Sequence, residues 1–265
     1  MKLTLIITTY NWPESLLLVM KSVENQTILP DEVIIADDGS SKKTKDLIVN
    51  YKIKSELNIL HSWQEDLGFR AARSRNNAIL KSTGDYIVLV DGDTILHRNF
   101  LKDHMSNAES GFFVQGYRVL LSKKESKKAF NKENIIFSFF NLGLKNRKNC
   151  IYSSLLSLIF STKKNHLRGI KSCNMAFYRK DFLNINGFNN EFEGWGREDS
   201  EFVVRLMNSG VNRKSVRFNA IQFHLWHNEN SRNSLEKNDV MLNHAIKCCI
   251  HWCDNGVNLM KKNES

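Results

Sequence analysis

Two carboxylates separated by one glycine are the first residues in this chain that could do chemistry. Asp91 and Asp93 flank Gly92, directly after the apolar run 86–90. In an extended chain, residues two apart point the same way, so both carboxylates face one site. Such a pair suits Mg²⁺ or Mn²⁺, whose remaining positions take water and phosphate oxygens. Asp-Gly-Asp is also common in turns, so its placement after a strand is what favours a metal site.

A second acidic pair, Asp37 and Asp38, also follows an apolar run. A carboxylate at this position can accept a hydrogen bond from a nucleotide base or from a ribose hydroxyl. The alternative is an Asx turn that opens the next helix. The two residues by themselves favour neither interpretation.

The stretch 194–199 places Trp195 between two glycines and then two acids, Glu198 and Asp199, at the predicted start of a helix. The glycines allow a close approach of the backbone to a ligand, and the tryptophan ring can lie against a sugar. Acids in a first helical turn stabilise the helix by ~0.3–1 kcal/mol, which explains the acids but not the tryptophan. The motif therefore favours a functional role over a purely structural one.

Two histidines, His224 and His227, are candidate metal ligands. On a strand, residues three apart face opposite sides, so the two would make a poor ligand pair. In a turn both could converge, although a single histidine that joins Asp93 on a metal is the simpler arrangement. A lone histidine is more often a core or surface residue.

The elements that must position these residues alternate between strand and helix. Apolar runs at 3–7, 33–36, 58–63 and 86–90 predict strands, and helical spacing lies between them. This alternation predicts a mostly parallel sheet, and ligands bind outside the carboxyl ends of such strands. The polar residues at those ends should converge on one cleft, and they are Thr8, Thr9, Tyr10, Asp37, Asp38, Asp91 and Asp93.

The later part of the chain is less regular. We expect strands at 174–178 and 221–226 and helices at 198–208 and 239–252. Between the two regular parts, 130–164 holds two apolar runs that are shorter than the ~20 residues needed to span a bilayer. This region predicts either a helical segment packed on the sheet or an interfacial helix pair with lysines towards anionic headgroups. The lysines at 123–128 are expected in a solvated loop.

Composition narrows the function classes. A net charge of +10 and a pI of about 9.3 are compatible with nucleic acid, an anionic membrane or a phosphorylated substrate. Acidic strand ends argue against nucleic acid, because they would repel phosphate without a metal. A dinucleotide-binding dehydrogenase would need Gly-x-Gly-x-x-Gly after the first strand, where this chain has TTYN. The five cysteines and the apparent lack of a signal peptide favour reduced thiols in a cytosolic protein.

Together these motifs resemble family 2 glycosyltransferases of the GT-A fold. The matching stretches are 6–11, 32–40 and 84–93, with Gly68, Arg75 and Asn76 between them. The stretch 192–199 is similar to the galactosyltransferase-type module of β-1,4-galactosyltransferases and chondroitin-type polymerases. The likeness extends from residue 3 to about residue 230, except for 112–166. It implies one α/β domain of GT-A type, with a Rossmann-like, mostly parallel central sheet flanked by helices and a C-terminal acceptor-side extension.

The resemblance also implies a division of the chain into four parts. Residues 1–110 form the nucleotide-sugar-binding half, and 111–168 a variable, partly apolar and basic insertion. Residues 169–230 form the galactosyltransferase-type half with the acceptor site and catalytic base, and 231–265 form a C-terminal helix and tail.

Each candidate residue receives a role from the resemblance. On the donor side, Thr8, Tyr10 and Asp37 hold uracil and ribose with Asp38 beside them, Arg75 lies near the base or diphosphate, Asp91 contacts ribose or metal, and Asp93 ligates metal. His227 matches a metal-ligating position, and His224 matches another more loosely. Asp199 is the expected general base, and Trp195 and Glu198 bind the acceptor. Arg197 stands where the galactosyltransferases usually have glycine, which leaves the acceptor and the donor sugar open.

The implied activity is an inverting transfer of a hexose or N-acetylhexosamine from a UDP-sugar, dependent on Mn²⁺ or Mg²⁺. The expected acceptor is a glycan or lipid-linked glycan of bacterial surface polysaccharide or lipopolysaccharide synthesis. We expect a cytoplasmic location, with peripheral contact to the inner face of the anionic membrane as an open alternative, and no nucleic acid partner. The competing hypothesis is a catalytically inactive relative that binds a glycan or a nucleotide sugar.

Overall fold

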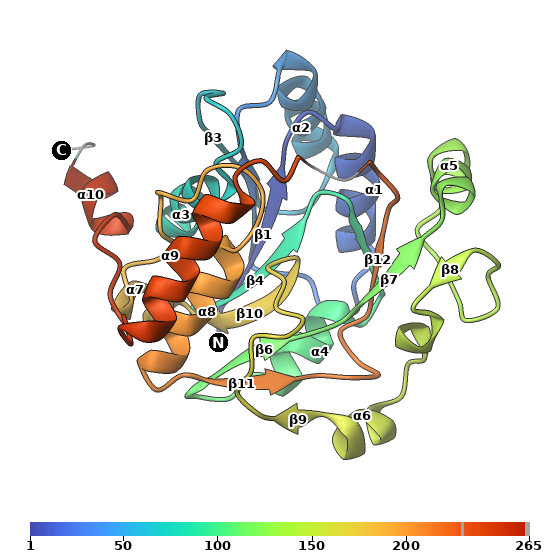
Figure 1. The fold of residues 1–265 in the computed structure, drawn as a ribbon. Helices are drawn as coiled ribbons and strands as arrows, with labels where there is room; N and C mark the ends of the chain where they lie inside the picture. Colours follow the sequence, from blue (N-terminus) through green and yellow to red (C-terminus); the bar gives the residue numbers. More distant parts are fainter. Residues whose placement is uncertain (229–230, 263–265) are drawn as a thin grey trace.

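A central eight-stranded sheet forms the middle layer of the computed structural model, which describes residues 1–228 and 231–262 (Figure 1). Its strand order is β3 (Ile59–Trp63), β2 (Glu32–Asp37), β1 (Leu3–Thr9), β4 (Tyr86–Asp91), β10 (Asn174–Tyr178), β6 (Phe112–Gln115), β11 (Asn212–Ser215) and β9 (Thr162–Lys163). The first four strands of this order pair in parallel, and β10 runs antiparallel between β4 and β6. The expected mostly parallel α/β sheet is confirmed.

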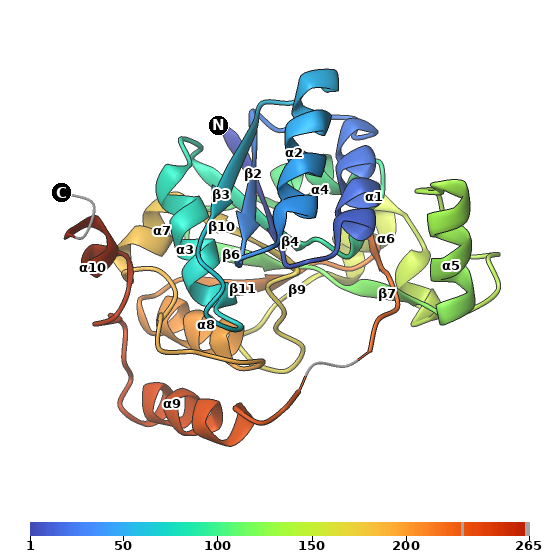
Figure 2. The same cartoon turned by 90° about the horizontal axis from the view of Figure 1, so that it is seen from above.

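Helices cover both faces of this sheet (Figure 2). Alternate residues of β1 point to opposite faces, because Leu5 and Ile7 join one apolar cluster and Ile6 joins the other. The first cluster includes α1 (Pro13–Glu24), α2 (Lys42–Lys54) and α4 (Phe100–Asn107). The second includes α3 (Ala71–Lys81), α7 (Arg179–Asn184) and α8 (Glu198–Asn208). Burial on both faces explains why the strands read as continuous apolar runs.

A smaller sheet lies beside the carboxyl end of β4. Its order is β5 (Thr94–Leu96), β12 (Gln222–His224), β7 (Arg118–Leu121) and β8 (Leu144–Lys145). Antiparallel pairing of β12 with β5 sets His224 opposite Thr94, and the Leu225 amide donates to the Asp93 carbonyl at 2.9 Å. The strand expected over 221–226 ends at His224, so the chain is free to turn before His227.

The region between β7 and β9 differs from the expectation. The lysines at 123–128 lie on a helix, α5 (Lys123–Lys132), because the Ser122 hydroxyl caps its first turn. Glu133 adopts a left-handed conformation that ends α5, and the apolar run after it is irregular. Only the second apolar run is helical, in α6 (Ser154–Phe160), after a short 3₁₀ turn, η1 (Arg147–Cys150). Among the described residues, no helix has the length and apolar character needed to cross a membrane.

Two helices complete the described chain, α9 (Leu235–Lys247) and α10 (Val257–Lys262). The terminal helix expected over 239–252 therefore starts and ends earlier than predicted. Cys249 lies in the left-handed region at φ 49°, which turns the chain away after Lys247. Residues 263–265 of the expected tail lie outside the described part.

A buried ion pair fixes the helix that follows the Gly-Trp-Gly motif. Arg205 of α8 is fully buried and donates to both carboxylate oxygens of Glu201 at 2.6 and 2.8 Å. Its third hydrogen bond, at 2.7 Å, reaches the Ile185 carbonyl and ties α8 to the turn after α7. The position of the N-terminus of α8 therefore depends on a charge that has no access to water.

We expect Glu201→Ala to lower the free energy of unfolding by about 3–5 kcal/mol, because the Arg205 charge would stay buried without its partner. Urea unfolding followed by circular dichroism measures this loss. Asp239→Ala is the matched control, since it removes an exposed ion pair with Arg197 on the same side of the molecule and should cost less than about 1 kcal/mol. Equal losses in the two variants would contradict the assignment.

Candidate active site

The carboxyl ends of β1, β2 and β4 meet in register and bring the expected polar residues together. Thr8 pairs with Asp91 and Thr9 pairs with Asp37 across the sheet. The Gly92 amide donates to the Thr8 carbonyl at 2.7 Å. A Cβ on Gly92 would lie 3.0 Å from the Thr9 hydroxyl and 3.1 Å from the Thr8 carbonyl oxygen, so a larger residue would be crowded at this point.

The Asp37–Asp38 pair holds the loops that follow the carboxyl end of β2. Asp37 is fully buried and accepts from the Ser40 amide and from His61 Nε2, each at 2.8 Å. Asp38 accepts from Gln64 Nε2 at 2.6 Å and from the Arg70 amide at 2.7 Å. Burial raises the pKa of Asp38 above its ordinary value. These carboxylates therefore hold the surrounding loops, and both interpretations from the sequence stay open.

Sequence reasoning assigned no role to the loop 64–70 beyond the match at Gly68, and this loop lies against Gly39. The Tyr10 hydroxyl, on a half-exposed ring, donates to Asp66 Oδ2 at 2.9 Å. Gly39 has φ +95°, and a Cβ there would lie 2.5 Å from the Asp66 Cα. The contact joins residues 56 positions apart, and the loop carries no motif that predicts it.

Arg75 lies at the centre of the site and is 4% exposed. Its guanidinium donates to the Thr8 hydroxyl at 3.2 Å, to Glu198 Oε1 at 3.2 Å and to Asp91 Oδ1 at 3.5 Å. Burial opposes its charge, but the carboxylates of Asp91, Glu198 and Asp199 raise the pKa of Arg75 and keep it cationic. The sequence placed Arg75 and Asp91 near the donor and Glu198 near the acceptor, and the structure joins all three.

Asp199 lies one residue further along α8 and is partly buried. Its Oδ2 accepts from the Ser172 amide at 3.3 Å, and its Oδ1 accepts from the Ser200 hydroxyl at 3.2 Å. Burial, together with the neighbouring charge of Glu198, raises the pKa of Asp199 to about 6. A carboxylate with such a pKa is poised to accept a proton near neutral pH.

The turn before α8 leaves Trp195 accessible. Gly194 and Gly196 have φ +74° and +107°, values that glycine adopts without strain. A Cβ on Gly194 would lie 2.2 Å from the Ser234 hydroxyl, so the following segment packs against the glycine itself. Trp195 is 39% exposed, and the Arg232 guanidinium lies 5.8 Å from its ring centre. The exposed ring agrees with the expected role of a platform for a sugar.

Asp93, His224 and His227 form a group with the geometry of a metal site. Asp93 Oδ2 lies 3.4 Å from His224 Nε2 and 3.1 Å from His227 Nε2, and the candidate ligand atoms all lie within 4.8 Å of one another. The other oxygen of Asp93 is buried and has no hydrogen-bond partner among the described residues. One carboxylate and two imidazoles around an unsatisfied acceptor fit a divalent cation. Both histidines join the group because β12 ends between them, whereas Asp91 is drawn to Arg75.

The protonation of this group follows from its contacts. Burial alone would raise the pKa of Asp93, but His224 and His227 lower it below the ordinary value. The hydrogen bond to Asp93 raises the pKa of His227, while burial lowers the pKa of His224. Asp93 is therefore ionised near neutral pH and available as a ligand.

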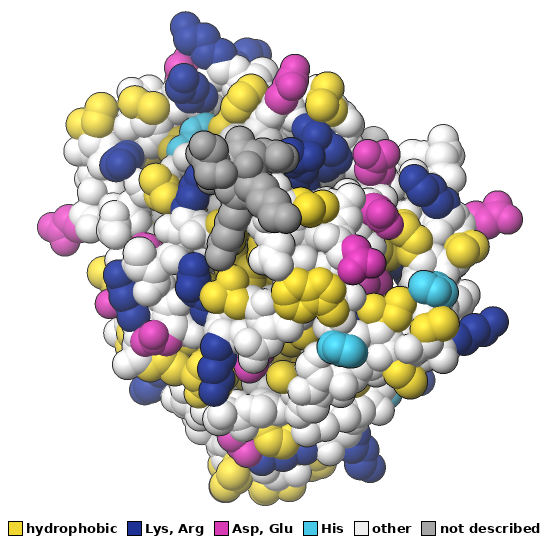
Figure 3. Space-filling model, turned by 90° about the vertical axis from the view of Figure 1, so that its left-hand side faces the viewer, with side chains coloured by type: hydrophobic (Ala, Val, Ile, Leu, Met, Phe, Trp, Pro, Cys, Tyr) yellow, Lys and Arg dark blue, Asp and Glu magenta, His cyan; other side chains and the backbone are white. Residues whose placement is uncertain are grey.

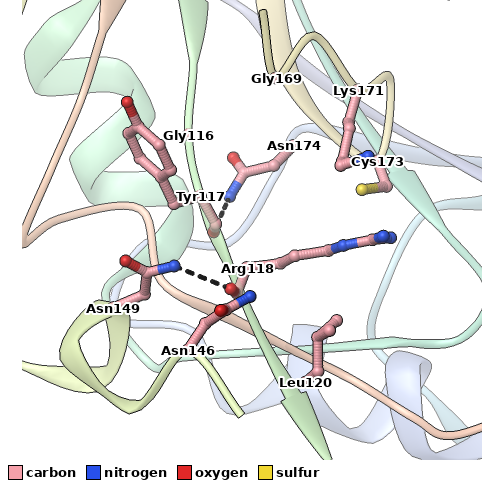
Figure 4. Close-up of a pocket in the computed structure, with 10 residues that line it drawn as sticks. All are labelled: Gly116, Tyr117, Arg118, Leu120, Asn146, Asn149, Gly169, Lys171, Cys173 and Asn174. Atoms are coloured by element: carbon pink, nitrogen blue, oxygen red, sulfur yellow. Dashed lines mark hydrogen bonds between the residues drawn. The ribbon is translucent and has the colours of Figure 1, made fainter.

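Sequence analysis also missed three residues on the far side of this group. Arg118, Lys171 and Cys173 line a cavity of about 170 Å³, and the Arg118 side chain extends towards Cys173 and Lys171 (Figure 4). Burial raises the pKa of Asp91 to about 6, and the positive charge of Arg118 opposes that rise. The same charge helps His224 and His227 to lower the pKa of Asp93. Lys171 opposes the rise in the pKa of Asp199 that burial causes. No spacing rule links these residues, because β7 and the loop before β10 meet only in the folded chain.

Comparison with known proteins assigns this arrangement to a family. Residues 4–184 match the family model described as glycosyl transferase family 2, and residues 156–228 match one described as the N-terminal domain of galactosyltransferase. Hyaluronan synthase of Pasteurella multocida is 28% identical over 81% of this chain and 24% of its own length. Chondroitin synthase of Escherichia coli is 26% identical over 81% of this chain and 33% of its own length.

A further relative is the GalNAc(5)-diNAcBac-PP-undecaprenol beta-1,3-glucosyltransferase of Campylobacter jejuni, which is 27% identical over 67% of this chain and 56% of its own length. The chain spans between about a quarter and a little over half of the length of these three relatives.

Solved structures share the fold. The crystal structure of S. aureus TarS 1–349 superposes with a TM-score of 0.63 at 16% identity, covering 98% of this chain and 68% of that one. The same protein in complex with UDP gives a TM-score of 0.62 at 17% identity, covering 91% of this chain and 64% of that one. The sheet topology described above is thus that of a GT-A glycosyltransferase. Since the family model matches more than half of its residues, the chain belongs to glycosyl transferase family 2.

Proposed function

We propose that the chain transfers a hexose or N-acetylhexosamine from a UDP-sugar to a glycan acceptor, with inversion at the anomeric carbon and with Mn²⁺ bound. The observation that carries the proposal is that the group of Asp93, His224 and His227 and the carboxylate of Asp199 lie around the same residue, Asp91, on which the charges of both Asp93 and Asp199 act. A general base and a charge-stabilising group on the two sides of a reacting carbon are what a single displacement requires.

Asp199 is the proposed general base. It accepts the proton of an acceptor hydroxyl while the hydroxyl oxygen bonds to the anomeric carbon. The bond from that carbon to the diphosphate breaks on the opposite face, and UDP leaves with the electron pair, so configuration inverts. The Ser172 amide and the Ser200 hydroxyl each bond one carboxylate oxygen, which fixes the direction in which Asp199 points.

Asp93, His224 and His227 are the proposed metal ligands. When bound, the metal neutralises charge on the leaving diphosphate. Imidazole suits Mn²⁺ and later transition metals better than Mg²⁺, which prefers an all-oxygen shell, so two histidines favour Mn²⁺. Arg118, whose charge acts on the same group, is placed to add a second positive charge near the diphosphate.

Further residues of the site are proposed to bind the donor nucleotide and the acceptor sugar. Thr8, Tyr10 and Asp37 hold uridine, and Asp38 supports them through the loop that it anchors. Trp195 offers its exposed ring to the acceptor sugar. Arg75 holds Asp91 and Glu198 in place rather than acting on the substrate alone. The UDP complex of TarS, as a fold relative, supports a uridine donor.

The proposed acceptor is a glycan of a bacterial surface polysaccharide or lipopolysaccharide, free or lipid-linked. The names of the hyaluronan and chondroitin synthases support a polysaccharide, and the name of the Campylobacter jejuni relative supports a glycan on undecaprenol. A lipid-linked acceptor would agree with the proposed location at the cytoplasmic side of the membrane.

The first test is UDP release from a panel of UDP-sugars with the purified chain. Slow hydrolysis of one donor with Mn²⁺, lost with EDTA, is the expected result and would name the sugar. Binding of a UDP-sugar or a glycan without any turnover would favour the inactive, ligand-binding relative instead.

Asp199→Asn should lower kcat for acceptor-dependent transfer by about 10²- to 10⁴-fold, because the amide cannot accept the proton. UDP-sugar affinity, measured by calorimetry, should stay within about threefold, since the donor does not depend on the base. Asp181→Asn, which alters an acid in the first turn of α7, is the control for a general effect of removing a helix-start charge. A normal kcat in Asp199→Asn would remove Asp199 from this role.

The rate of transfer should fall as the solution is acidified through about pH 6. The base works ionised, and burial raises the pKa of Asp199 to about 6, so each further pH unit below that value should cost about tenfold in kcat/KM. The profile is recorded at saturating Mn²⁺, so that histidine protonation does not empty the metal group. A rate that stays constant down to about pH 4.5, which is about one and a half units below this pKa, would contradict the assignment of Asp199 as the base.

His224→Ala and His227→Ala should each raise the Mn²⁺ concentration for half-maximal activity by about tenfold to a hundredfold, because each removes one ligand. Mn²⁺ titration of the initial rate measures this, with His244→Ala, an exposed histidine on α9, as the matched control. An unchanged titration for His224→Ala alone would reduce the group to Asp93 and His227.

A further inference from the structure

The net positive charge of this protein comes from one segment. Residues 111–168 hold 12 of the 38 lysines and arginines and two of the 28 acids. The rest of the chain therefore has 26 groups of each sign and no net charge, so the whole +10 belongs to 111–168. Figure 3 agrees, because the face away from this segment shows acidic and basic side chains interspersed. A surface that merely keeps a protein in solution would not need such segregation.

The same segment exposes an unusual share of large apolar side chains. Among the described residues, 26 large hydrophobic side chains are exposed, and ten of them come from 136–160. Phe140 and Leu158 are the two most exposed of all, at 87% and 83%. Scattered exposed apolar residues are ordinary, but a group drawn from one short segment indicates an interaction surface.

The helix α6 exposes its apolar side chains and buries a polar one, which is the reverse of the usual arrangement for a protein in water. Its inward residue is Ser157, which is buried and bonds Ser161, while Leu155, Leu158 and Ile159 are 62–83% exposed. A helix on a soluble surface normally buries its apolar stripe. The orientation is locked on its inner side, because the Ser153 amide donates to the Phe218 carbonyl and the Ser153 hydroxyl caps α6. These hydrogen bonds therefore keep the apolar face of α6 directed towards solvent.

The α5 end of this segment adjoins the proposed metal group. The Trp226 amide, next to His227, donates to the Ser126 hydroxyl of α5 at 2.7 Å. Phe137 packs on Phe223 of β12 with ring centres 5.0 Å apart. A partner bound at α5 and around Phe137 would thus lie near that group.

We propose that this docking surface rests on an anionic lipid bilayer. The docking surface comprises the apolar residues Ile136, Phe140, Leu142, Leu155, Leu158 and Ile159, together with the exposed lysines of α5. The apolar side chains enter the interface between headgroups and acyl chains, and the lysines contact anionic headgroups. A second copy of the chain is a poor occupant, because two surfaces that each carry the whole +10 would repel.

The inference deepens the proposed function, since a bilayer would bring a lipid-linked acceptor to the cleft. The test of binding needs no substrate, so it can fail or succeed independently of the proposed reaction. A wild-type protein that binds vesicles but hydrolyses no UDP-sugar would leave the surface assigned and the reaction refuted.

The experiment is co-sedimentation of the full chain with vesicles of two compositions. Phosphatidylcholine vesicles that contain about one-third phosphatidylglycerol should sediment the protein, and pure phosphatidylcholine vesicles should bind it at least about tenfold more weakly. Raising the salt concentration should release it, because screening removes the headgroup attraction. Equal binding to both vesicles, or no binding to either, overturns the proposal.

Matched variants separate this surface from the rest of the molecule. Leu158→Glu should weaken vesicle binding by about tenfold or more, whereas Ile53→Glu on α2, at a residue 77% exposed, should not. Replacing Lys124, Lys127 and Lys132 by Gln should weaken it by about tenfold to a hundredfold. The control replaces Lys42, Lys43 and Lys45 of α2, which are equally exposed. All of these side chains are exposed, so the variants should keep their unfolding free energy and their rate of UDP-sugar hydrolysis.

The outcome also discriminates among occupants. Loss of binding in the α5 and α6 variants alone supports the bilayer. Equal loss in the α2 controls means that binding follows net charge and not this surface, and it overturns the proposal. A concentration-dependent dimer abolished by Leu158→Glu, with no vesicle binding, also overturns it and assigns the surface to a second copy.

Discussion

The site depends on keeping one buried guanidinium among several carboxylates. Arg75 comes from α3, Asp91 from the end of β4, and Glu198 from the start of α8, so a single side chain joins both halves of the chain. Removing either Arg75 or one of its carboxylate partners would destabilise the fold, because the charge left behind would be buried with almost no water around it. With Asp91 and Glu198 held by Arg75, the neighbouring Asp93 and Asp199 are left free for the proposed metal and the proposed proton transfer. The position of Arg75 therefore decides which of the four acids are held in ion pairs and which are not.

Two sheets together bring the residues of the site into contact. The large sheet aligns the ends of β1, β2 and β4. Helices packed on both of its faces hold these strands in register. The small sheet joins β5 to β12 and brings His224 to Asp93 across 131 positions of sequence. The proposed metal group therefore lies between the two sheets, and neither sheet contributes all three of its residues. The second half of the chain must fold before these three residues can come together.

The segment 111–168 shows how a surface can follow different rules from the core beside it. Its inner residues obey ordinary packing, as Phe137 and Ser126 do against β12 and the residues after it. Its outer residues reverse the usual preference, with serine inward and leucine outward on α6. The reversal is stable because the inner hydrogen bonds of Ser153 and Ser157 hold the helix, so the exposed apolar atoms add nothing to the fold. Side chains that the fold does not need are free to serve a partner.

The sequence by itself determined the alternating elements, the strand ends that carry Asp37, Asp91 and Asp93, and the helix start at Glu198, because these depend on local periodicity and turn chemistry. It also indicated the family, through motifs that are short but correctly ordered. It could not decide that both histidines reach Asp93, that Glu198 belongs to Arg75, or that Arg118 and Lys171 face the site. Those facts rest on contacts between residues far apart in the chain. Which side of a helix or turn is buried, and which charge finds which partner, is settled only when the layers pack.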